Sequence, residues 1–430
     1  MTSRYADLSR AQVAALVPEL LLIGQLIDRS GMAWCISAFG REEMAQIAIE
    51  EWAAASPIYT RRMQHALGYA GPPDAGDVVT IFKGLQLDIG APPQFMDFRY
   101  TVHDRWTGKF HLDHCGALMD VEPMGPDYVR SMCHTIEDPT FDATAVATNP
   151  RAQVRPIHRP PRLPADRTPH CAWTVRIDPA HPPVSGIPAL AVNERSRAAT
   201  LALDPIDPLD EGAADYAGPL VDDLDFAAFS HSALVRIADE VCLQMHLLNL
   251  AFLLALRART GDDEAGRTQA RTIATKQLTG IAGVAADRIR RALDLPADAA
   301  GAVEVLRLHP LLNPAAYVAA SVDRGACSID VGPSAAHEDG AWITLVGPGA
   351  TGPLQAAVRG VSAYLDVDVT GSADAWTATL RTLDEPAKEP DEVAVTRIST
   401  GASFAFEPRR SLPIFPVTQP VTQRGAAAPA

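Results

Sequence analysis

The sequence predicts an α+β protein built from two homologous units, each with several helices followed by a small antiparallel sheet. Three observations support this prediction. The first quarter of the chain has apolar residues at helical spacing, short β-rich segments begin at Phe95, and the second half repeats the same order of landmarks. A chain of 430 residues is too long for one ordinary hydrophobic core, so we expect two domains.

The N-terminal quarter of the chain is expected to be helical. Residues 11–29 and 41–69 have apolar positions at helical spacing, and Pro57 predicts a kink or break within the second segment. After a Gly-Pro-Pro break, the segment DVVTIFKGLQLDIG (77–90) predicts a further helix that ends at Gly90.

Short strands are expected next. The segment FRYTVHDRWTGKFHLDHC (98–115) predicts two strands around a turn at Thr107–Gly108, and CAWTVRI (171–177) predicts a third strand. Between them, GPDYVRSMCHTIEDP (125–139) predicts a helix that stops before Pro139. The residues expected on the apolar face of this helix are Val129, Met132, Cys133 and Ile136.

The second half of the chain repeats these landmarks in the same order. IAIEEWAAASPIYTRRMQHALGY (47–69) aligns without gaps with IATKQLTGIAGVAADRIRRALDL (273–295), and CAWTVRIDP corresponds to DAWTATLRT. Near the C-terminus, EVAVTRISTGASFAFEP (392–408) alternates around Thr-Gly and predicts a hairpin. The expected divisions are an N-terminal unit at 1–178, a Pro/Asp/Ala-rich linker at 179–225, a degenerate second unit at 226–407 and an extended tail at 408–430.

Composition excludes several classes of function. The net charge of −15 would repel a phosphate backbone or an anionic membrane, so we expect neither nucleic acid nor membrane as a partner. The N-terminal segment contains charges and no small-residue cleavage site, which argues against a signal peptide. Six scattered cysteines predict reduced thiols in a cytoplasm. A small-molecule substrate is the expected partner, and a homodimer is left open.

Reactive side chains are concentrated in HLDHC (111–115) and MCHTIED (132–138). On a regular strand, His111, Asp113 and Cys115 would share one face and supply a base, an orienting carboxylate and a nucleophilic thiol. The corresponding segment of the second half has neither the histidines nor the cysteine. We therefore expect the chemistry in the first unit.

The helix that follows adds a second group of candidate catalytic residues. Cys133 and Glu137 are i,i+4 neighbours, as are His134 and Asp138, so an imidazole has a carboxylate within reach. Either Cys115 or Cys133 is the candidate reactive thiol. The alternatives are that Cys133 packs in the core and that His134 and Asp138 form a solvated pair.

Substrate binding is expected from the Pro/Arg-rich stretch that follows. Arg159 or Arg162 would hold a substrate carboxylate as a bidentate fork, and the alternative is a solvated linker. His158 and Cys171 complete the candidate binding residues, although a cysteine that opens a β-rich strand is more often a core residue.

A metal site is the main alternative chemistry, although we expect no cofactor. Iron or zinc would be held by the side chains of the same region, but neither C-x-x-C nor H-E-x-x-H is present. The candidate ligands are His111, Asp113, His114, His134 and Glu137. The chain also lacks a P-loop, a dinucleotide fingerprint and a G-x-S-x-G elbow, which argues against ATP, NAD and serine-hydrolase chemistry.

The order C-(x17)-C-(x4)-D-x-x-F, then N-P, R and H-C-x-W, is found between residues 115 and 173. Its members are Cys115, Cys133, Asp138, Phe141, Asn149, Pro150, Arg159, Cys171 and Trp173. Over roughly residues 10–177 the chain resembles the L-2-amino-thiazoline-4-carboxylic acid hydrolase-like family. The resemblance implies hydrolytic opening of a small cyclic amidine-like ring.

The residues and the resemblance together predict a hydrolase. Cys115, activated by His111 and Asp113, or a water activated by the same histidine, would attack an sp² carbon, and His134 with Asp138, or Glu137, would protonate the leaving nitrogen or sulfur. The alternatives are a metal-dependent oxygenase or lyase that uses the His/carboxylate set, and a non-catalytic small-molecule-binding protein.

Overall fold

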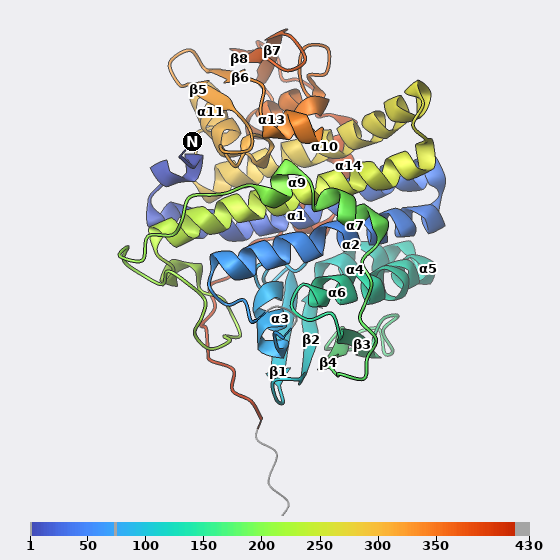
Figure 1. Cartoon of the computed structure of the whole chain (residues 1–430). Coiled ribbons are helices and arrows are strands. Elements are labelled where there is room, and N and C mark those ends of the chain that lie inside the picture. Colours follow the sequence, from blue (N-terminus) through green and yellow to red (C-terminus); the bar gives the residue numbers. More distant parts are fainter. Residues whose placement is uncertain (1, 73–74, 418–430) are drawn as a thin grey trace, which may run out of the picture.

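Four long helices separate two small antiparallel sheets that lie at opposite ends of the molecule (Figure 1). This computed structural model describes residues 2–72 and 75–417. Within them, the strands form two four-stranded sheets with the orders β1-β2-β4-β3 and β5-β6-β8-β7. The α+β class and the two-unit architecture are confirmed, because both sheets have the same order of strands and each follows a pair of long helices.

The first unit runs from the N-terminus to the end of β4. Its elements are α1 (Arg10–Phe39), α2 (Arg41–Ala66), α3 (Val78–Leu85), β1 (Met96–Val102), β2 (Thr107–Cys115), α4 (Gly116–Val121), α5 (Pro126–Arg130), α6 (Glu137–Val146), β3 (Ala152–His158) and β4 (Cys171–Ile177). Two short helices, α7 (Pro188–Asn193) and α8 (Arg197–Thr200), lie in the predicted linker.

The second unit begins with a pair of helices of similar length to the first pair. Its elements are α9 (His231–Thr260), α10 (Glu264–Ala292), α11 (Ala299–Leu308), β5 (Ala320–Asp323), β6 (Ser328–Val331), α12 (Ala335–Asp339), α13 (Gly352–Val361), β7 (Leu365–Gly371), β8 (Trp376–Thr382) and α14 (Asp391–Thr396).

The ends of the long helices repeat between the units. Ser9 and Ser230 cap the first turns of α1 and α9 through their side chains. Gly40 and Gly261 end the same two helices with φ of 86° and 87°, a conformation that a residue with a Cβ rarely adopts. The repeat seen in the sequence therefore extends to the signals that start and stop each helix.

The two units share a hydrophobic core. The helix α1 packs against α9 and α10 as well as α2, and the buried apolar side chains form a continuous cluster that includes both sheets. The reason is that α1 and α9 are apolar around most of their circumference, so a single partner helix cannot cover either of them. The two cores suggested by chain length are thus merged into one.

Length and apolar composition would also allow α1 and α9 to cross a membrane. In the structure, however, 67% of the most apolar window of α1 and 83% of that of α9 are buried inside the fold. This burial is typical of the core helices of a soluble protein.

Two prolines predicted to interrupt helices do not end them. Pro57 lies inside α2, which continues to Ala66. Pro139 lies near the start of α6, which follows α5 (Pro126–Arg130) and the segment Ser131–Ile136 without a break in helical conformation. A single wide π-type turn, Ser131–Ile136, precedes α6 and places the start of the helix at that position. The four predicted apolar-face residues around this turn are all buried.

The predicted hairpin at 392–408 is wrong, because this segment forms α14 and a short 3₁₀ turn, Thr400–Ala402. The helix α14 packs closely on α10 at Gly280, where a Cβ would lie 2.3 Å from the Thr396 Oγ1. Tertiary packing on a helix therefore outweighed the alternating pattern. The first hairpin turn is also shifted, since β2 already begins at Thr107.

The predicted linker packs on the helical layer, and the tail runs beside the linker and β1. Asn193 of α7 donates hydrogen bonds of 3.0 Å to the carbonyls of Ala54 in α2 and Leu247 in α9. Up to residue 417, the Ile414 N–H donates to the Leu220 carbonyl over 2.7 Å and the Val417 N–H donates to the Val102 carbonyl over 2.8 Å. The rest of the predicted tail, 418–430, lies outside the described residues.

Candidate functional site

The strand that carries HLDHC does not keep His111, Asp113 and Cys115 on one face. In the pairing of β1 with β2, Phe98 lies opposite Leu112 but Met96 lies opposite Cys115, so β2 has one extra residue between the two pairs. Such a bulge reverses the alternation of side chains beyond it. The prediction of a shared face is therefore wrong.

His111 and Asp113 lie on the solvent side of β2. The His111 Nε2 is 3.3 Å from the Asp113 Oδ1, and the two side chains are 37% and 52% exposed. Cys115 is instead 2% exposed, with its Sγ 3.7 Å from the Met96 Sδ. The expected base and orienting carboxylate are thus paired with each other but separated from the expected nucleophile.

The Cys115 side chain is held as a thiol. Burial, followed by the nearby Glu137, raises its pKa to about 12 against the opposing effect of the Leu118 N–H, which donates to the Sγ over 3.4 Å. A thiolate is the nucleophilic form of cysteine, so this environment suppresses nucleophilic chemistry near neutral pH.

Cys133 and Cys171 share the environment of Cys115. Both are buried, and burial followed by Glu137 raises the pKa of each thiol well above its ordinary value. Cys115 contributes to the raised pKa of both other thiols, so the three side chains and the Glu137 carboxyl form a neighbourhood inside the first unit. The alternative interpretation, in which Cys133 and Cys171 are core residues, agrees with their burial.

The candidate histidines are held by backbone carbonyls or aromatic rings. His134 Nε2 lies 2.6 Å from the Pro160 carbonyl, and His158 Nε2 lies 3.2 Å from the Pro169 carbonyl. His114 packs against the rings of Phe95 and Phe404, which also contact each other, and burial lowers its pKa.

The candidate metal ligands lie in separate parts of the structure. His111 and Asp113 face solvent, while Glu137 is buried on another element. Across the described ranges 2–72 and 75–417, no three His, Cys, Asp or Glu side chains lie close enough to share a metal ion. The metal-ligand prediction is corrected accordingly, because the histidines of HLDHC and MCHTIED point to different surroundings.

The two candidate arginine clamps already bind carboxylates of the protein. Arg159 Nη1 donates to the Asp138 Oδ1 over 2.6 Å. Arg162 forms a two-pronged interaction with Glu122, with distances of 2.9 and 2.6 Å. Their guanidinium groups hold the Pro/Arg-rich segment against the helices, so the predicted role in binding a substrate carboxylate gains no support.

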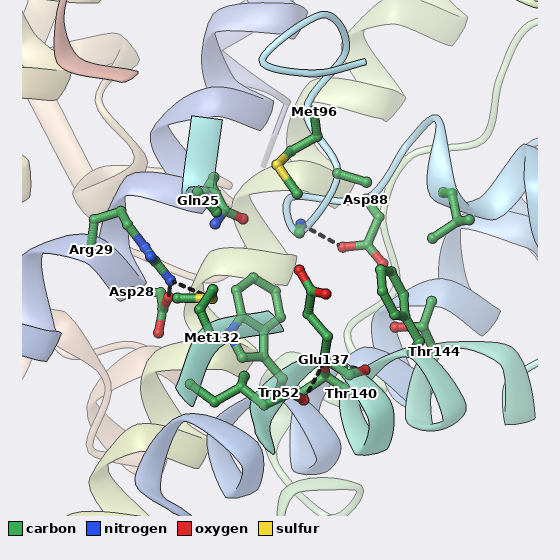
Figure 2. Close-up of a pocket in the computed structure, with 16 residues that line it drawn as sticks. Gln25, Asp28, Arg29, Trp52, Asp88, Met96, Met132, Glu137, Thr140 and Thr144 are labelled. Atoms are coloured by element: carbon green, nitrogen blue, oxygen red, sulfur yellow. Dashed lines mark hydrogen bonds and ion pairs between the residues drawn. The ribbon is translucent and has the colours of Figure 1, made fainter. Parts of the chain in front are cut away.

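The structure instead places Glu137 in a cavity between α1, α2, α6 and the loop after α3 (Figure 2). The cavity leaves about 80 Å³ for the centres of water-sized molecules. Figure 2 shows the Glu137 side chain rising from α6 into this space, with Trp52 to one side and Asp88 to the other. Polar side chains from elements far apart in the sequence therefore meet here.

Glu137 is positioned by the wide turn that precedes α6. It is the first residue of the helix, and its Oε2 is buried without a hydrogen-bond partner among the described residues. Burial, followed by the neighbouring Asp138, raises its pKa to about 8 against the opposing effect of Arg159 and Arg29. Near neutral pH this side chain is mostly a neutral carboxylic acid that can donate a proton.

Asp88 is held at the opposite side of the cavity by two donors. The Tyr59 hydroxyl donates to its Oδ1 over 2.8 Å, and the Gly90 N–H donates to the same oxygen over 2.7 Å. Burial raises the pKa of Asp88 to about 6 against the opposing effect of the two donors. Near neutral pH this side chain is mostly a carboxylate.

The remaining polar side chains that line the cavity come from α1. Arg29 forms an ion pair with Asp28, and Gln25 has a buried Oε1 without a partner in the described part of the chain. Asp28, followed by Asp120, favours the charged form of Arg29 against the opposing effect of burial. The ion pair adds no net charge to the cavity.

Sequence reasoning missed Gln25, Asp28, Arg29 and Asp88. Three of them interrupt the apolar run of α1, and the fourth follows α3 in the apolar segment LQLDIG. Polar residues at otherwise apolar helical positions were the available signal, because a buried polar group needs a partner or a function.

Comparisons with known proteins found no relative of this chain. No family model, no curated protein and no solved structure matches this chain. The assignment of a function therefore depends on the geometry and chemistry of the cavity.

Proposed function

We propose that this protein is a hydrolase that cleaves a C–N bond of a small cyclic amidine or amide by general acid–base catalysis in the Glu137 cavity. The observation that carries the proposal is that Glu137 and Asp88 line one cavity with pKa values of about 8 and about 6. Two carboxyl groups whose environments separate their pKa values are suited to opposite roles, one as acid and one as base.

Asp88 would act as the base and Glu137 as the acid. The Asp88 carboxylate accepts a proton from a water molecule, and the water oxygen forms a bond to the sp² carbon of the substrate. Glu137 gives its proton to the leaving nitrogen as the C–N bond breaks. After the reaction, Asp88 is protonated and Glu137 is ionised. Asp88 then releases its proton to solvent and Glu137 takes one up, which restores both groups.

The charge of the cavity supports a neutral or cationic substrate. The Asp28–Arg29 pair has no net charge, Glu137 is mostly neutral near pH 7, and Asp88 is mostly ionised. The local charge of about −1 that follows attracts an amidinium and repels a carboxylate. This favours the amidine part of the predicted substrate over the predicted carboxylate.

The cysteine mechanism has less support than a water nucleophile. Cys115 is a buried thiol with a pKa of about 12, and the paired His111 and Asp113 face solvent on the other side of β2. We also propose a cytoplasmic location, which is supported by the free state of the cysteines in the described chain.

The pH dependence of kcat/KM tests the proposal directly. With small cyclic amidines, thiazolines and lactams as substrates, we expect activity to rise through about pH 6 as Asp88 ionises and to fall through about pH 8 as Glu137 ionises. Asp88→Asn should remove the acidic limb and Glu137→Gln the alkaline limb, each with a loss of roughly 10²- to 10⁴-fold.

The control is Asp113→Asn, which neutralises a half-exposed carboxylate of the same unit outside the cavity. It should leave both limbs in place. Unchanged pH limbs in both cavity variants would reject the proposed roles of Asp88 and Glu137.

A further inference from the structure

A second cavity adjoins the first on the outer side of α1. The two cavities share Arg29, Met132 and Ile136 in their linings. The second leaves about 170 Å³ for the centres of water-sized molecules, roughly twice the space of the first. These three buried side chains therefore form the boundary between the two cavities, where the Arg29 Nη2 lies 3.8 Å from the Met132 Sδ.

The second cavity is lined mainly by flexible apolar side chains. The chain has nine methionines, and four of them line this space: Met32, Met44, Met124 and Met132. Methionine side chains are unbranched and polarizable, so they adapt to apolar groups of different shape. Chance placement does not account well for this concentration in one cavity.

The outer rim of this cavity exposes apolar surface. Met124 is 51% exposed and Ile398 is 80% exposed, and both line the cavity. Exposed apolar residues that continue into a cavity are typical of a ligand-binding groove. A path lined by apolar side chains thus leads from solvent at Ile398 to the shared residues at Arg29 and Met132.

The second unit supplies one wall of this cavity and holds it in place. The Ser399 hydroxyl donates to the Asp120 Oδ2 over 2.6 Å, and the Thr400 N–H donates to the Asp120 Oδ1 over 2.7 Å. The Thr396 hydroxyl lies 2.9 Å from the Ser30 hydroxyl of α1. The wall is therefore fixed to both α4 and α1, as in a preformed binding site.

From this arrangement we infer that the natural substrate carries an apolar tail that lies in the methionine-lined cavity while its polar head lies beside Glu137 and Asp88, with the unbranched Met132 side chain at the boundary moved aside. The substrate class is a small cyclic amidine or amide with an alkyl substituent. This inference rests on the proposed function for the identity of the head, and it adds the tail and the contribution of the second unit.

Calorimetric titration with straight-chain amidines, from acetamidine to octanamidine, tests the tail separately from catalysis. Affinity should rise roughly fourfold with each added methylene, because each one removes apolar surface from water, until the tail reaches the rim. Ala33→Phe would fill the cavity from an exposed position on α1 and should abolish this gain while leaving acetamidine binding unchanged.

The matched control is Ala38→Phe, an exposed alanine of the same helix that does not line either cavity. It should bind the whole series as the unmodified protein does. Met124→Ser, at the half-exposed rim, should reduce the gain for the longest amidines only.

Affinity that does not depend on chain length, or a gain that survives in Ala33→Phe, would overturn the inference. These binding results do not depend on turnover. If the pH limbs were unaltered in Asp88→Asn and Glu137→Gln but the chain-length gain disappeared in Ala33→Phe, the proposed reaction would fail while the tail site remained.

Discussion

At the residue scale, the environment of a side chain decides its chemistry more than its type does. Two carboxyl groups of the same cavity, Asp88 and Glu137, differ because one accepts hydrogen bonds from Tyr59 and Gly90 while the other has an unpartnered buried oxygen. Hydrogen bonds to a carboxylate favour its charged form, and burial without them favours the neutral form.

The same reasoning predicts a mild effect of Cys115→Ser. Cys115 caps the first turn of α4 by accepting from the Leu118 N–H, and serine is a preferred residue at such a position. We expect the free energy of unfolding to change by less than ~1 kcal/mol and turnover to be retained, because Asp88 and Glu137 carry out the proposed reaction without the thiol. Thermal unfolding and kcat measure the two effects.

Alkylation with iodoacetamide provides the complementary measurement. Cys115 should react slowly near neutral pH, since burial keeps it in the thiol form. Loss of activity by several orders of magnitude in Cys115→Ser, together with fast alkylation, would restore the cysteine mechanism.

At the element scale, close helix packing decides the conformation of the C-terminal segment. In α10, Gly280 allows α14 to approach, since a Cβ there would lie 2.3 Å from the Thr396 Oγ1 and 2.4 Å from the Ser30 Oγ. The wall of the methionine-lined cavity continues directly from α14, so this contact also positions the proposed tail site.

Gly280→Ala should therefore lower the free energy of unfolding by roughly 1–3 kcal/mol, because the added methyl group must displace α14 or the hydroxyl groups beside it. Chemical denaturation measures this change. Gly332→Ala is the control, because a Cβ at Gly332 would meet no atom of the described residues within 4 Å. Equal stability of the two variants would contradict the close-packing interpretation.

At the scale of the whole molecule, the two units are bound by a shared helical layer. The helix α1 is covered by α9 and α10 of the second unit in addition to α2. Removing the second unit would expose the apolar faces of α1 and α2 to water, and such surfaces promote aggregation.

A fragment of residues 1–178 should consequently fail to fold as a stable monomer, although it contains the whole Glu137 cavity. We expect it to aggregate or to unfold without a cooperative transition, as judged by gel filtration and thermal circular dichroism. Co-expression with residues 179–430 should restore a folded complex. A monomeric fragment with a sharp melting transition would show that the units are independent.

The sequence by itself determined the class of fold, the repeat and most of the elements. Helical spacing found α1, α2 and α3, and β-rich composition found β4 with its bounds at Cys171–Ile177. These features depend on local periodicity and on capping residues such as Ser9 and Gly40, which act within a few residues along the chain.

Only the tertiary structure decided which polar residues meet. One extra residue in β2 turned Cys115 away from His111 and Asp113, and a wide turn before α6 placed Glu137 opposite Asp88. A bulge and a wide turn each reorient every side chain beyond them, and neither has a reliable local sequence pattern. The cavity also joins segments more than a hundred residues apart, whose contacts are set by packing of the whole chain.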